Sequence, residues 1–292
     1  MKDQIIKFLA YNGKISVVCC STTNLVEEAR KLHDLSPLST AAMGRVLTIT
    51  ALIGSEMKNK TDKLTIQIKG NGPIGILTAV ADSNGNVKGY VGNSKVDLPL
   101  RESDGKLDVG GAVGKQGMLY IIKDLGIGKP YVGMTPIVSG EIAEDFTNYF
   151  ATSEQIPTVI ALGVLVDKNG IKSAGGYKLS LMPDAGEEEI SKIEEQIKNI
   201  EPVSRMLDEN KTLEEIAKIV TGDENLKVLE RTEPKFECNC SREKCEKGLI
   251  AIGKKELEDI IKEEEKIQIE CNFCNSKYVF TREELQEIVA KM

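Results

Sequence analysis

Apolar and polar residues alternate in short stretches between Ile15 and Leu181, a pattern typical of strands that bury one face. The alternation predicts strands at residues 15–20, 64–68, 76–81, 87–91, 118–122, 131–138, 159–166 and 171–181. Two of the intervals between them, Ser83-Asn84-Gly85-Asn86 and Asp167-Lys168-Asn169-Gly170, carry the turn residues of β-hairpins. Because the strands come mostly in hairpins, we expect a largely antiparallel sheet.

Helical patterns interrupt these strands. They predict helices from about residues 22–24 to 32, from 37 to 57 and from 141 to 152. The second begins with Ser36 and Pro37, residue types that are favoured at the start of a helix. Residues 1–182 are therefore predicted to form one α+β domain.

The pattern changes at Pro183 to charged, amphipathic helices. The isoleucines that share the first helical face are Ile190, Ile193, Ile197 and Ile200. A second helix begins at the capping box Thr212-Leu213-Glu214-Glu215, carries Ile216 on its apolar face and ends at Gly222. Residues 183–232 have too few apolar side chains to form a core alone. We expect a helical linker whose apolar stripes lie on the N-terminal domain.

The last segment, residues 233–292, is too small to bury much of a core and needs a staple such as a metal ion. A short helix is predicted from Ser241 to about residue 250, and a second near residues 257–261. A strand is predicted at residues 277–280, followed by a final helix that begins at the capping box Thr281-Arg282-Glu283-Glu284.

Five of the seven cysteines lie beyond Glu237, and four of these form two close pairs. The pairs are Cys238-Asn239-Cys240 and Cys271-Asn272-Phe273-Cys274, with residues 241–270 between them. Two such knuckles can place four thiolates around one zinc ion, so we predict one Zn²⁺ per chain. A permanent structural zinc and a regulated one both fit this spacing. The basic residues near the pairs that could offset the thiolate charge are Lys235, Arg242, Lys244 and Lys277.

Composition argues against several classes of function. The 292 residues carry a formal net charge of −7, which disfavours binding of nucleic acid mainly through phosphate contacts. Residues 1–14 lack the apolar run and cleavage site of a signal peptide, and no apolar stretch approaches the roughly 18 residues of a membrane span. We expect a cytoplasmic protein with no membrane partner, whose thiols are free or metal-bound.

The string Gly70-Asn71-Gly72-Pro73-Ile74-Gly75 has the spacing of a dinucleotide-binding loop. Such a loop must open a helix, whereas Pro73 interrupts this string and a predicted strand follows it. We interpret the string as a turn and predict no nucleotide site.

The remaining reactive side chains are interpreted as structural. His33 is the only histidine, which excludes a metal site built from several histidines. Cys19 and Cys20 lie in an apolar strand and are expected to be buried, inert thiols. Cys245 lies outside the paired pattern and is interpreted as a bystander. No catalytic residue is predicted.

With these motifs the chain resembles, over essentially its whole length, the redox-regulated heat-shock chaperones known as thirty-three-kilodalton chaperonins. The most specific match is the four-cysteine set with its flanks at residues 241–243 and 275–280. Further matching strings are Ala41-Ala42-Met43-Gly44-Arg45, the glycine string at 70–75, Gly105-Lys106-Leu107-Asp108-Val109, Val138-Ser139-Gly140-Glu141, Ser153-Glu154-Gln155-Ile156-Pro157, Ala174-Gly175-Gly176-Tyr177 and Glu201-Pro202-Val203-Ser204.

The resemblance implies an ATP-independent holdase, not an enzyme, whose reduced and zinc-bound form is inactive. It also implies that oxidation joins Cys238 to Cys240 and Cys271 to Cys274 by disulfides and releases zinc. The C-terminal domain and the linker then loosen, the chain dimerises, and exposed apolar surface captures unfolding client proteins. The residues that we expect to form the client surface are Ile190, Ile193, Ile197, Ile200, Leu213 and Ile216.

Two other classes of function share the cysteine pairs. The first is a zinc module that binds nucleic acid, but residues 233–277 hold nine Lys and Arg against eleven Asp and Glu, a poor electrostatic match to phosphate. The second is a thiol–disulfide oxidoreductase that uses Cys271 and Cys274. Its CxxC motif is expected at the start of a helix, whereas here the motif precedes a predicted strand.

Overall fold

The structure is a computed structural model, and it describes residues 2–198 and 200–292. It divides into two compact units, one ending at Glu237 and the other beginning at Cys238. The three-part division into residues 1–182, 183–232 and 233–292 stays a prediction.

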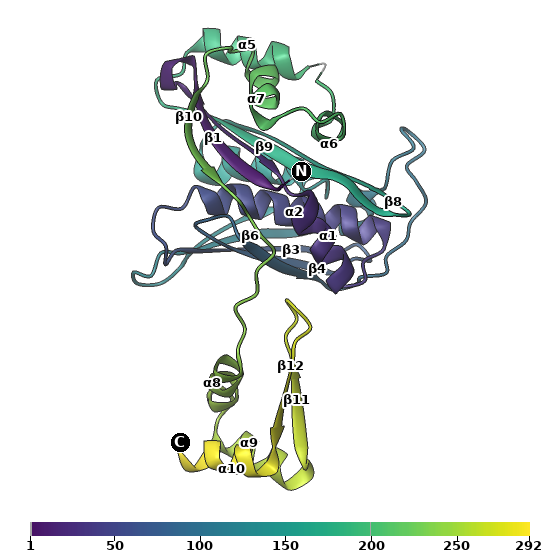
Figure 1. Cartoon of the computed structure of the whole chain (residues 1–292), viewed down its shortest axis with the longest axis vertical. Helices are drawn as coiled ribbons and strands as arrows, with labels where there is room; N and C mark the ends of the chain where they lie inside the picture. The colour runs from purple at the N-terminus through teal and green to yellow at the C-terminus, as the bar shows by residue number, and fades with distance from the viewer. Residues whose placement is uncertain (1, 199) are drawn as a thin grey trace. The chain divides into compact units, whose positions relative to one another are not determined.

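The first sheet of the larger unit has the strand order β10-β1-β2-β9-β8, and every pair in it is antiparallel. Its strands are β1 (Gln4–Ala10), β2 (Ile15–Ser21), β8 (Thr158–Asp167), β9 (Gly170–Leu181) and β10 (Lys227–Thr232). The sequence pattern identifies β2, β8 and β9 but misses β1 and β10. In Figure 1, β10 lies beside β1 although the two strands come from opposite ends of this unit's sequence.

The second sheet has the order β5-β4-β3-β6-β7 and is also antiparallel throughout. Its strands are β3 (Lys63–Gly70), β4 (Ile76–Asp82), β5 (Val87–Val91), β6 (Gly117–Asp124) and β7 (Tyr131–Pro136). The glycine string at residues 70–75 joins β3 to β4 as a turn, as predicted.

The core of this unit fills the space between the two sheets around the long helix α2 (Pro37–Ser55) (Figure 1). Helix α2 begins where the sequence predicts, because the Ser36 side chain accepts a hydrogen bond from Ser39 N–H at 3.2 Å and Pro37 occupies the first turn. Small residues let it pack closely: a Cβ at Gly44 would lie 2.6 Å from Val26 Cγ1. The shorter elements around it are α1 (Thr23–Leu32), α3 (Val109–Val113), α4 (Ala143–Tyr149), the 3₁₀ turn Tyr11–Gly13 and the π-helical turn Phe150–Glu154.

Helix α2 corrects one expectation about apolar stretches. With 19 residues and a mean hydropathy of 1.3 in its best 18-residue window, it is long and apolar enough to cross a membrane. However, 94% of that window is buried inside the fold, as in a core helix. The sequence prediction overlooked this stretch because Ser and Thr side chains are interspersed along it.

The linker forms a further layer on the opposite face of the first sheet. Its helices are α5 (Glu187–Ile197), α6 (Val203–Asp208) and α7 (Leu213–Thr221), which lie over β1 and β9 in Figure 1. They share a second apolar cluster with the sheet residues Ile6, Phe8, Val17 and Leu179. The prediction of helix throughout the linker is wrong at residues 227–232, which form β10, and Ile200 lies beyond the end of α5.

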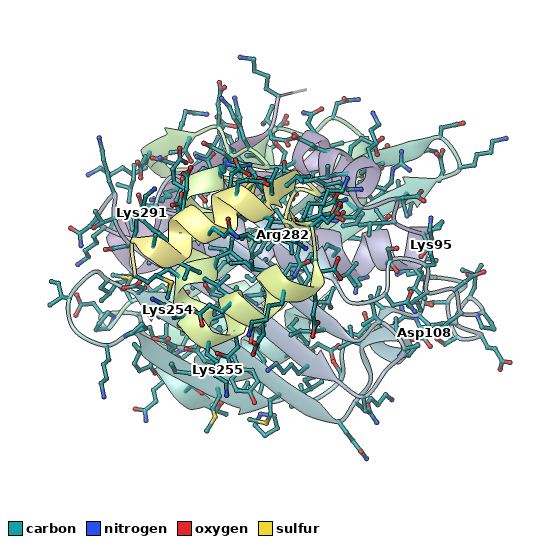
Figure 2. All side chains as sticks on the ribbon, turned by 90° about the horizontal axis from the view of Figure 1, so that it is seen from below. Lys95, Asp108, Lys254, Lys255, Arg282 and Lys291 are labelled. Carbon is teal, nitrogen blue, oxygen red and sulfur yellow. The ribbon has the colours of Figure 1, made fainter. Side chains whose placement is uncertain are left out.

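The smaller unit holds α8 (Arg242–Ile252), α9 (Lys254–Glu263) and α10 (Arg282–Ala290) beside a hairpin of β11 (Lys266–Glu270) and β12 (Lys277–Thr281). Sequence patterns miss β11. The buried apolar side chains of the unit are Leu249, Leu257, Phe280, Leu285 and Ile288. Lys254 and Lys255 lie at the start of α9 and Lys291 just after α10 (Figure 2), and all three are exposed. A core of this size is small for a unit that runs from Cys238 to Met292.

Candidate metal centre

The first cysteine pair lies on a segment of chain that leads into a helix. Cys238 and Cys240 precede α8, and Ser241 caps that helix by accepting a hydrogen bond from Lys244 N–H at 3.3 Å. Lys244 Nζ donates to the carbonyl oxygen of Asn239, between the two cysteines. The first turn of α8 therefore fixes the end of this knuckle and places the Lys244 ammonium group beside it.

The second pair forms the turn of the β11–β12 hairpin. Cys271 N–H donates to Ser276 O at 2.9 Å, and Cys271 O accepts from the N–H groups of Cys274 and Asn275 at 3.2 and 2.7 Å. Asn275 adopts a φ of 54°, a left-handed conformation that asparagine tolerates better than most residues. This tight turn places Cys271 and Cys274 close together at the end of the hairpin.

The two knuckles bring all four sulfur atoms into one cluster. The Sγ atoms of Cys238, Cys240, Cys271 and Cys274 lie within 4.8 Å of one another, and all four residues are partly buried. Two contacts run between the knuckles, at 3.8 Å from Cys238 Sγ to Cys271 Sγ and 3.2 Å from Cys240 Sγ to Cys274 Sγ. Such a set could hold a metal ion, and all seven cysteines of the chain are free thiols.

The thiols of this cluster differ in their electrostatic surroundings. Burial raises the pKa of Cys238 to about 12 and also raises the pKa of Cys271. Burial acts in the same direction on Cys274, but hydrogen bonds with the side chain and backbone of Ser276 and with Cys240 outweigh it and lower the pKa to about 6. The Tyr278 hydroxyl lies 3.1 Å from Cys240 Sγ, and this contact raises the pKa of the tyrosine.

Of the four basic residues that the sequence places near the pairs, Lys244 is the one whose hydrogen bond reaches a knuckle in the described part of the chain. Arg242 donates to Val279 O at 2.7 Å, pairs with Glu284 at 2.6 Å and lies 4.2 Å from the centre of the Phe280 ring. Lys277 lies 3.9 Å from Glu270, and Lys235 belongs to the larger unit. Arg242 therefore stabilises the small core instead of the sulfur cluster.

The other cysteines lie apart from the cluster. Cys245 packs against the small core from α8, where burial raises its pKa. Cys19 and Cys20 are fully buried on opposite faces of β2, and burial raises the pKa of both thiols. The expectation that these two are buried thiols is confirmed.

The predicted client residues are covered in this structure. Leu213, Ile216 and Ile193 are buried between the linker helices and the first sheet, while Ile190, Ile197 and Ile200 are partly buried. The expectation that the linker stripes lie on the N-terminal domain is confirmed for all of these side chains except Ile190, which lies outside the apolar cluster shared with the first sheet. The three buried side chains can contact another protein only if the linker moves.

Sequence reasoning misses two residues that contact the sulfur atoms, Ser276 and Tyr278, and one that anchors the chain before the first pair in the larger unit, Phe236. Ser276 and Tyr278 lie beyond the CxxC motif, and only the hairpin turn brings them to the sulfur atoms. Phe236 precedes the first cysteine by two positions and is buried in the larger unit's core, edge-on to His33 with ring centres 6.3 Å apart. The sequence signal that could have indicated a role for Tyr278 is its alternation with Phe280, which places both side chains on one face of a strand.

The sequence model of the Hsp33 protein family matches residues 3–281. The chain is 48% identical over 292 residues to the 33 kDa chaperonin of Clostridioides difficile (strain 630), with 100% of both chains covered. The chain belongs to the Hsp33 family. A second Hsp33 relative, the 33 kDa chaperonin of Clostridium beijerinckii, is 46% identical over 290 residues, which are 99% of each chain.

The Hsp33 fold is also seen in a crystal structure of the 33 kDa chaperonin from Thermotoga maritima. This chain matches it with a TM-score of 0.91 at 40% identity, covering 100% of this chain and 99% of the other. The predicted fold class, α+β with a largely antiparallel sheet and a small C-terminal unit that carries the cysteine pairs, is confirmed, although the strands of the larger unit form two sheets and not one. Membership of the Hsp33 family supports a chaperone role, and such a role implies binding of unfolded client proteins.

Proposed function

We propose that this chain is a redox-regulated, ATP-independent holdase whose reduced form binds one Zn²⁺ through Cys238, Cys240, Cys271 and Cys274. The observation that carries the proposal is the four-thiol cluster within 4.8 Å, in a unit with a small apolar core. The protein acts in the cytoplasm on unfolding client proteins, forms a homodimer on activation, and has no catalytic or nucleotide site.

The geometry of the cluster suits zinc. Four thiolates at about 2.3 Å from a tetrahedral zinc ion are separated from one another by about 3.8 Å. The sulfur contacts of 3.8 and 3.2 Å need little adjustment to reach that arrangement. Zinc bound here would tie the first knuckle to the hairpin turn, and such binding contributes about 10–16 kcal/mol in small structural sites.

Oxidation of the cluster removes the ligands that a metal needs. Each cysteine pair gives two electrons to an oxidant such as hypochlorite or peroxide and forms one disulfide, Cys238 with Cys240 and Cys271 with Cys274. The oxidant is reduced to chloride or water, and the disulfide sulfurs carry no negative charge to hold a cation. This pairing comes from the family resemblance. The four sulfur atoms lie within 4.8 Å of one another, and each pair must close to about 2.05 Å to form its disulfide.

The free energy that zinc binding contributes is large compared with the usual stability of a whole domain. Whole domains are usually stable by only about 5–15 kcal/mol, so a segment that loses the contribution of zinc unfolds. The linker then loosens from the first sheet. The apolar stripes of the linker and the sheet face beneath them then become accessible to clients. The stripe residues include Ile190, Ile193, Ile197, Ile200, Leu213 and Ile216.

Light scattering from a heat-unfolded client protein tests the proposal, with reduced or oxidised chain present and with or without ATP. We expect protection by the oxidised form only, equal with and without ATP, accompanied by release of one zinc per chain and reversed by thiol reductant with zinc. Equal protection by both redox forms would show a constitutive chaperone with a structural metal. Protection by neither form would favour the nucleic-acid-binding alternative.

A further inference from the structure

Strand β10 is attached to the fold mainly through its backbone. It forms the outer edge of the first sheet and pairs antiparallel with β1, from Ile5 opposite Thr232 to Leu9 opposite Lys227 (Figure 1). None of its six side chains is buried, and Val228 and Leu229 are 41% and 51% exposed. An edge strand without buried side chains adds little hydrophobic stabilisation to the sheet.

The side-chain contacts of β10 are ion pairs at the surface. Glu230 lies 2.7 Å from Lys7, and Arg231 lies 2.6 Å from Glu214 on α7. Exposed ion pairs of this kind contribute about 0–1 kcal/mol each. The ladder is also interrupted by a bulge between Lys7 and Phe8. Strand β10 can therefore leave the sheet at a lower cost than any strand with a buried face.

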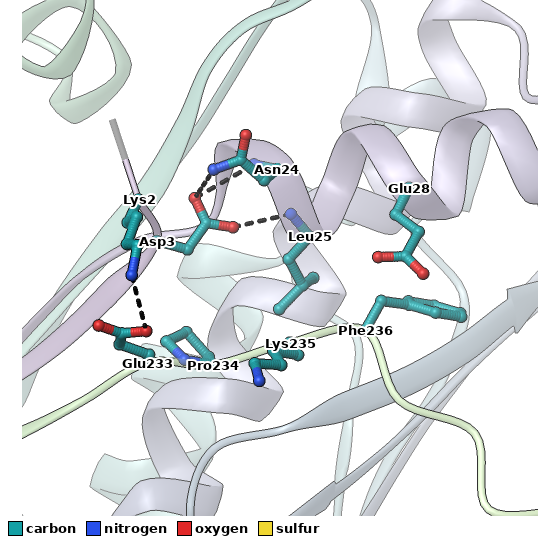
Figure 3. Close-up of a pocket in the computed structure, with 9 residues that line it drawn as sticks. All are labelled: Lys2, Asp3, Asn24, Leu25, Glu28, Glu233, Pro234, Lys235 and Phe236. Carbon is teal, nitrogen blue, oxygen red and sulfur yellow. Dashed lines mark hydrogen bonds and ion pairs between the residues drawn. The ribbon is translucent and has the colours of Figure 1, made fainter.

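The chain that follows β10 is held at one main point. Figure 3 shows residues 233–236 passing over a hollow at the start of α1, lined by Lys2, Asp3, Asn24, Leu25 and Glu28. Beyond the hollow, Phe236 enters the core, and the backbone of Lys235 and Glu237 bonds to Val87 at the edge of β5, at 2.8 and 2.7 Å. Once this anchor opens, β10 is retained only by its ladder with β1 and by the two ion pairs.

Strand β1, in contrast, remains in place without β10. Ile5, Ile6, Phe8 and Ala10 are buried, and β1 pairs with β2 over its full length. Departure of β10 would leave β1 as an open edge, with a row of unpaired N–H and C=O groups. Three of these side chains, Ile6, Phe8 and Ala10, also belong to the apolar face that α5–α7 cover. An open edge beside an open apolar face suits an extended peptide segment.

We propose that β10 occupies a client-binding edge, and that the activated protein binds extended segments of unfolding proteins by strand addition to β1. This inference rests on the proposed function, since the linker must loosen first. Leu226 and Val228 show the side-chain preference: Leu226 packs against the apolar cluster, and Val228 lies opposite Phe8. Client segments that fit carry apolar residues at alternate positions, while main-chain hydrogen bonds supply sequence-independent affinity.

A labelled peptide of residues 225–234 tests this edge in the unaltered protein. We expect it to bind the oxidised form at least about tenfold more tightly than the reduced form and to displace a heat-unfolded client. Two matched peptides sharpen the test, one N-methylated at Glu230 and Thr232 and the other at Arg231 and Glu233. Only one of these sets of N–H groups can face β1, so one peptide loses binding and the other retains it. Equal behaviour of the two, or no displacement of client, overturns the proposal.

A covalent lock tests the same edge through client protection. Lys7 and Glu230 are paired in register, so Lys7→Cys with Glu230→Cys forms a disulfide across β1 and β10 when the protein is oxidised, and each single variant is a control. We expect the locked protein to release zinc but to protect a client about tenfold less well than the controls. Full protection by the locked protein refutes strand addition.

These experiments distinguish a failure of the proposed function from occupation of the β1 edge by something other than a client. If wild-type protein neither releases zinc nor protects the client after oxidation, the proposed function fails and not only the edge. If the lock abolishes the dimer in light-scattering mass measurements but leaves client protection intact, the edge belongs to a second copy of this chain. That result also overturns the proposal.

Discussion

Each knuckle of the sulfur cluster is shaped by contacts that need no metal. The Cys271 carbonyl accepts two backbone N–H groups in its turn, and Ser241 caps the helix after the first pair. Tyr278 adds a hydroxyl contact to Cys240. These contacts shape each knuckle but join the two only weakly, because sulfur–sulfur and sulfur–hydroxyl hydrogen bonds are poor ones. We therefore expect the metal to supply the main link between them.

Replacement of two ligands tests that link. In reduced protein, Cys271→Ser with Cys274→Ser is expected to abolish zinc binding, since serine hydroxyls are poor zinc ligands, and to unfold residues 238–292. Elemental analysis and far-ultraviolet circular dichroism measure the two effects. The matched control is Cys245→Ser, which alters a thiol of the same unit outside the cluster and should keep one zinc per chain. Full zinc content in the double variant would contradict the ligand assignment.

Helix α7 shows which contacts keep the linker helices folded. Its capping box is complete: Thr212 Oγ1 accepts from Glu215 N–H at 3.2 Å, and Thr212 N–H donates to Glu215 Oε2 at 2.7 Å. Gly222 ends the helix in the left-handed conformation. A helix of nine residues is too short to be stable alone, so α7 depends on these caps and on its burial against the first sheet.

Weakening this cap should loosen the linker without touching the cysteines. Thr212→Ala is expected to cost about 1 kcal/mol and to increase the open population of the linker about fivefold. Hydrogen exchange of the α5–α7 amides in reduced protein measures that change. Thr281→Ala removes the equivalent cap of α10 and should raise exchange only within residues 238–292. Identical exchange patterns for the two variants would show that the linker does not open as a separate element.

The sequence predicts elements well where the signal is local. The capping boxes at Thr212 and Thr281 and the hairpin turn at residues 83–86 lie close in sequence to the structure that they determine. The four cysteines are similar, because the two members of each pair lie within four residues of one another. Strand β10 is different: five of its six side chains are exposed, so its position depends on the backbone of β1, a partner that is distant in sequence. Tyr278 likewise reaches Cys240 only after the hairpin has formed.

At the scale of the whole molecule, the stability of the two units has different origins. The larger unit has a continuous core around α2 and a second cluster beneath the linker. The smaller has five buried apolar side chains and the sulfur cluster. Loss of the metal should therefore unfold one unit and leave most of the other intact.

Hydrogen exchange on oxidised protein checks this partition. Protection should fall mainly beyond about residue 184, and residues 15–180 should keep theirs because their core contains no part of the sulfur cluster. Protein oxidised and then treated with reductant and zinc is the control and should regain the original pattern. A uniform fall across residues 15–180 would mean that the two units are one cooperative structure.

The exposed side chains of β10 have a consequence for how this family varies in evolution. Selection acts on a strand's side chains when they pack, but β10 needs only an extended backbone with its N–H groups intact. Mutations there should be nearly neutral unless they introduce proline, which removes a donor from the ladder. Sequences of relatives can therefore diverge along residues 227–232 and resemble a drifting loop, while the position of the strand in space stays constant.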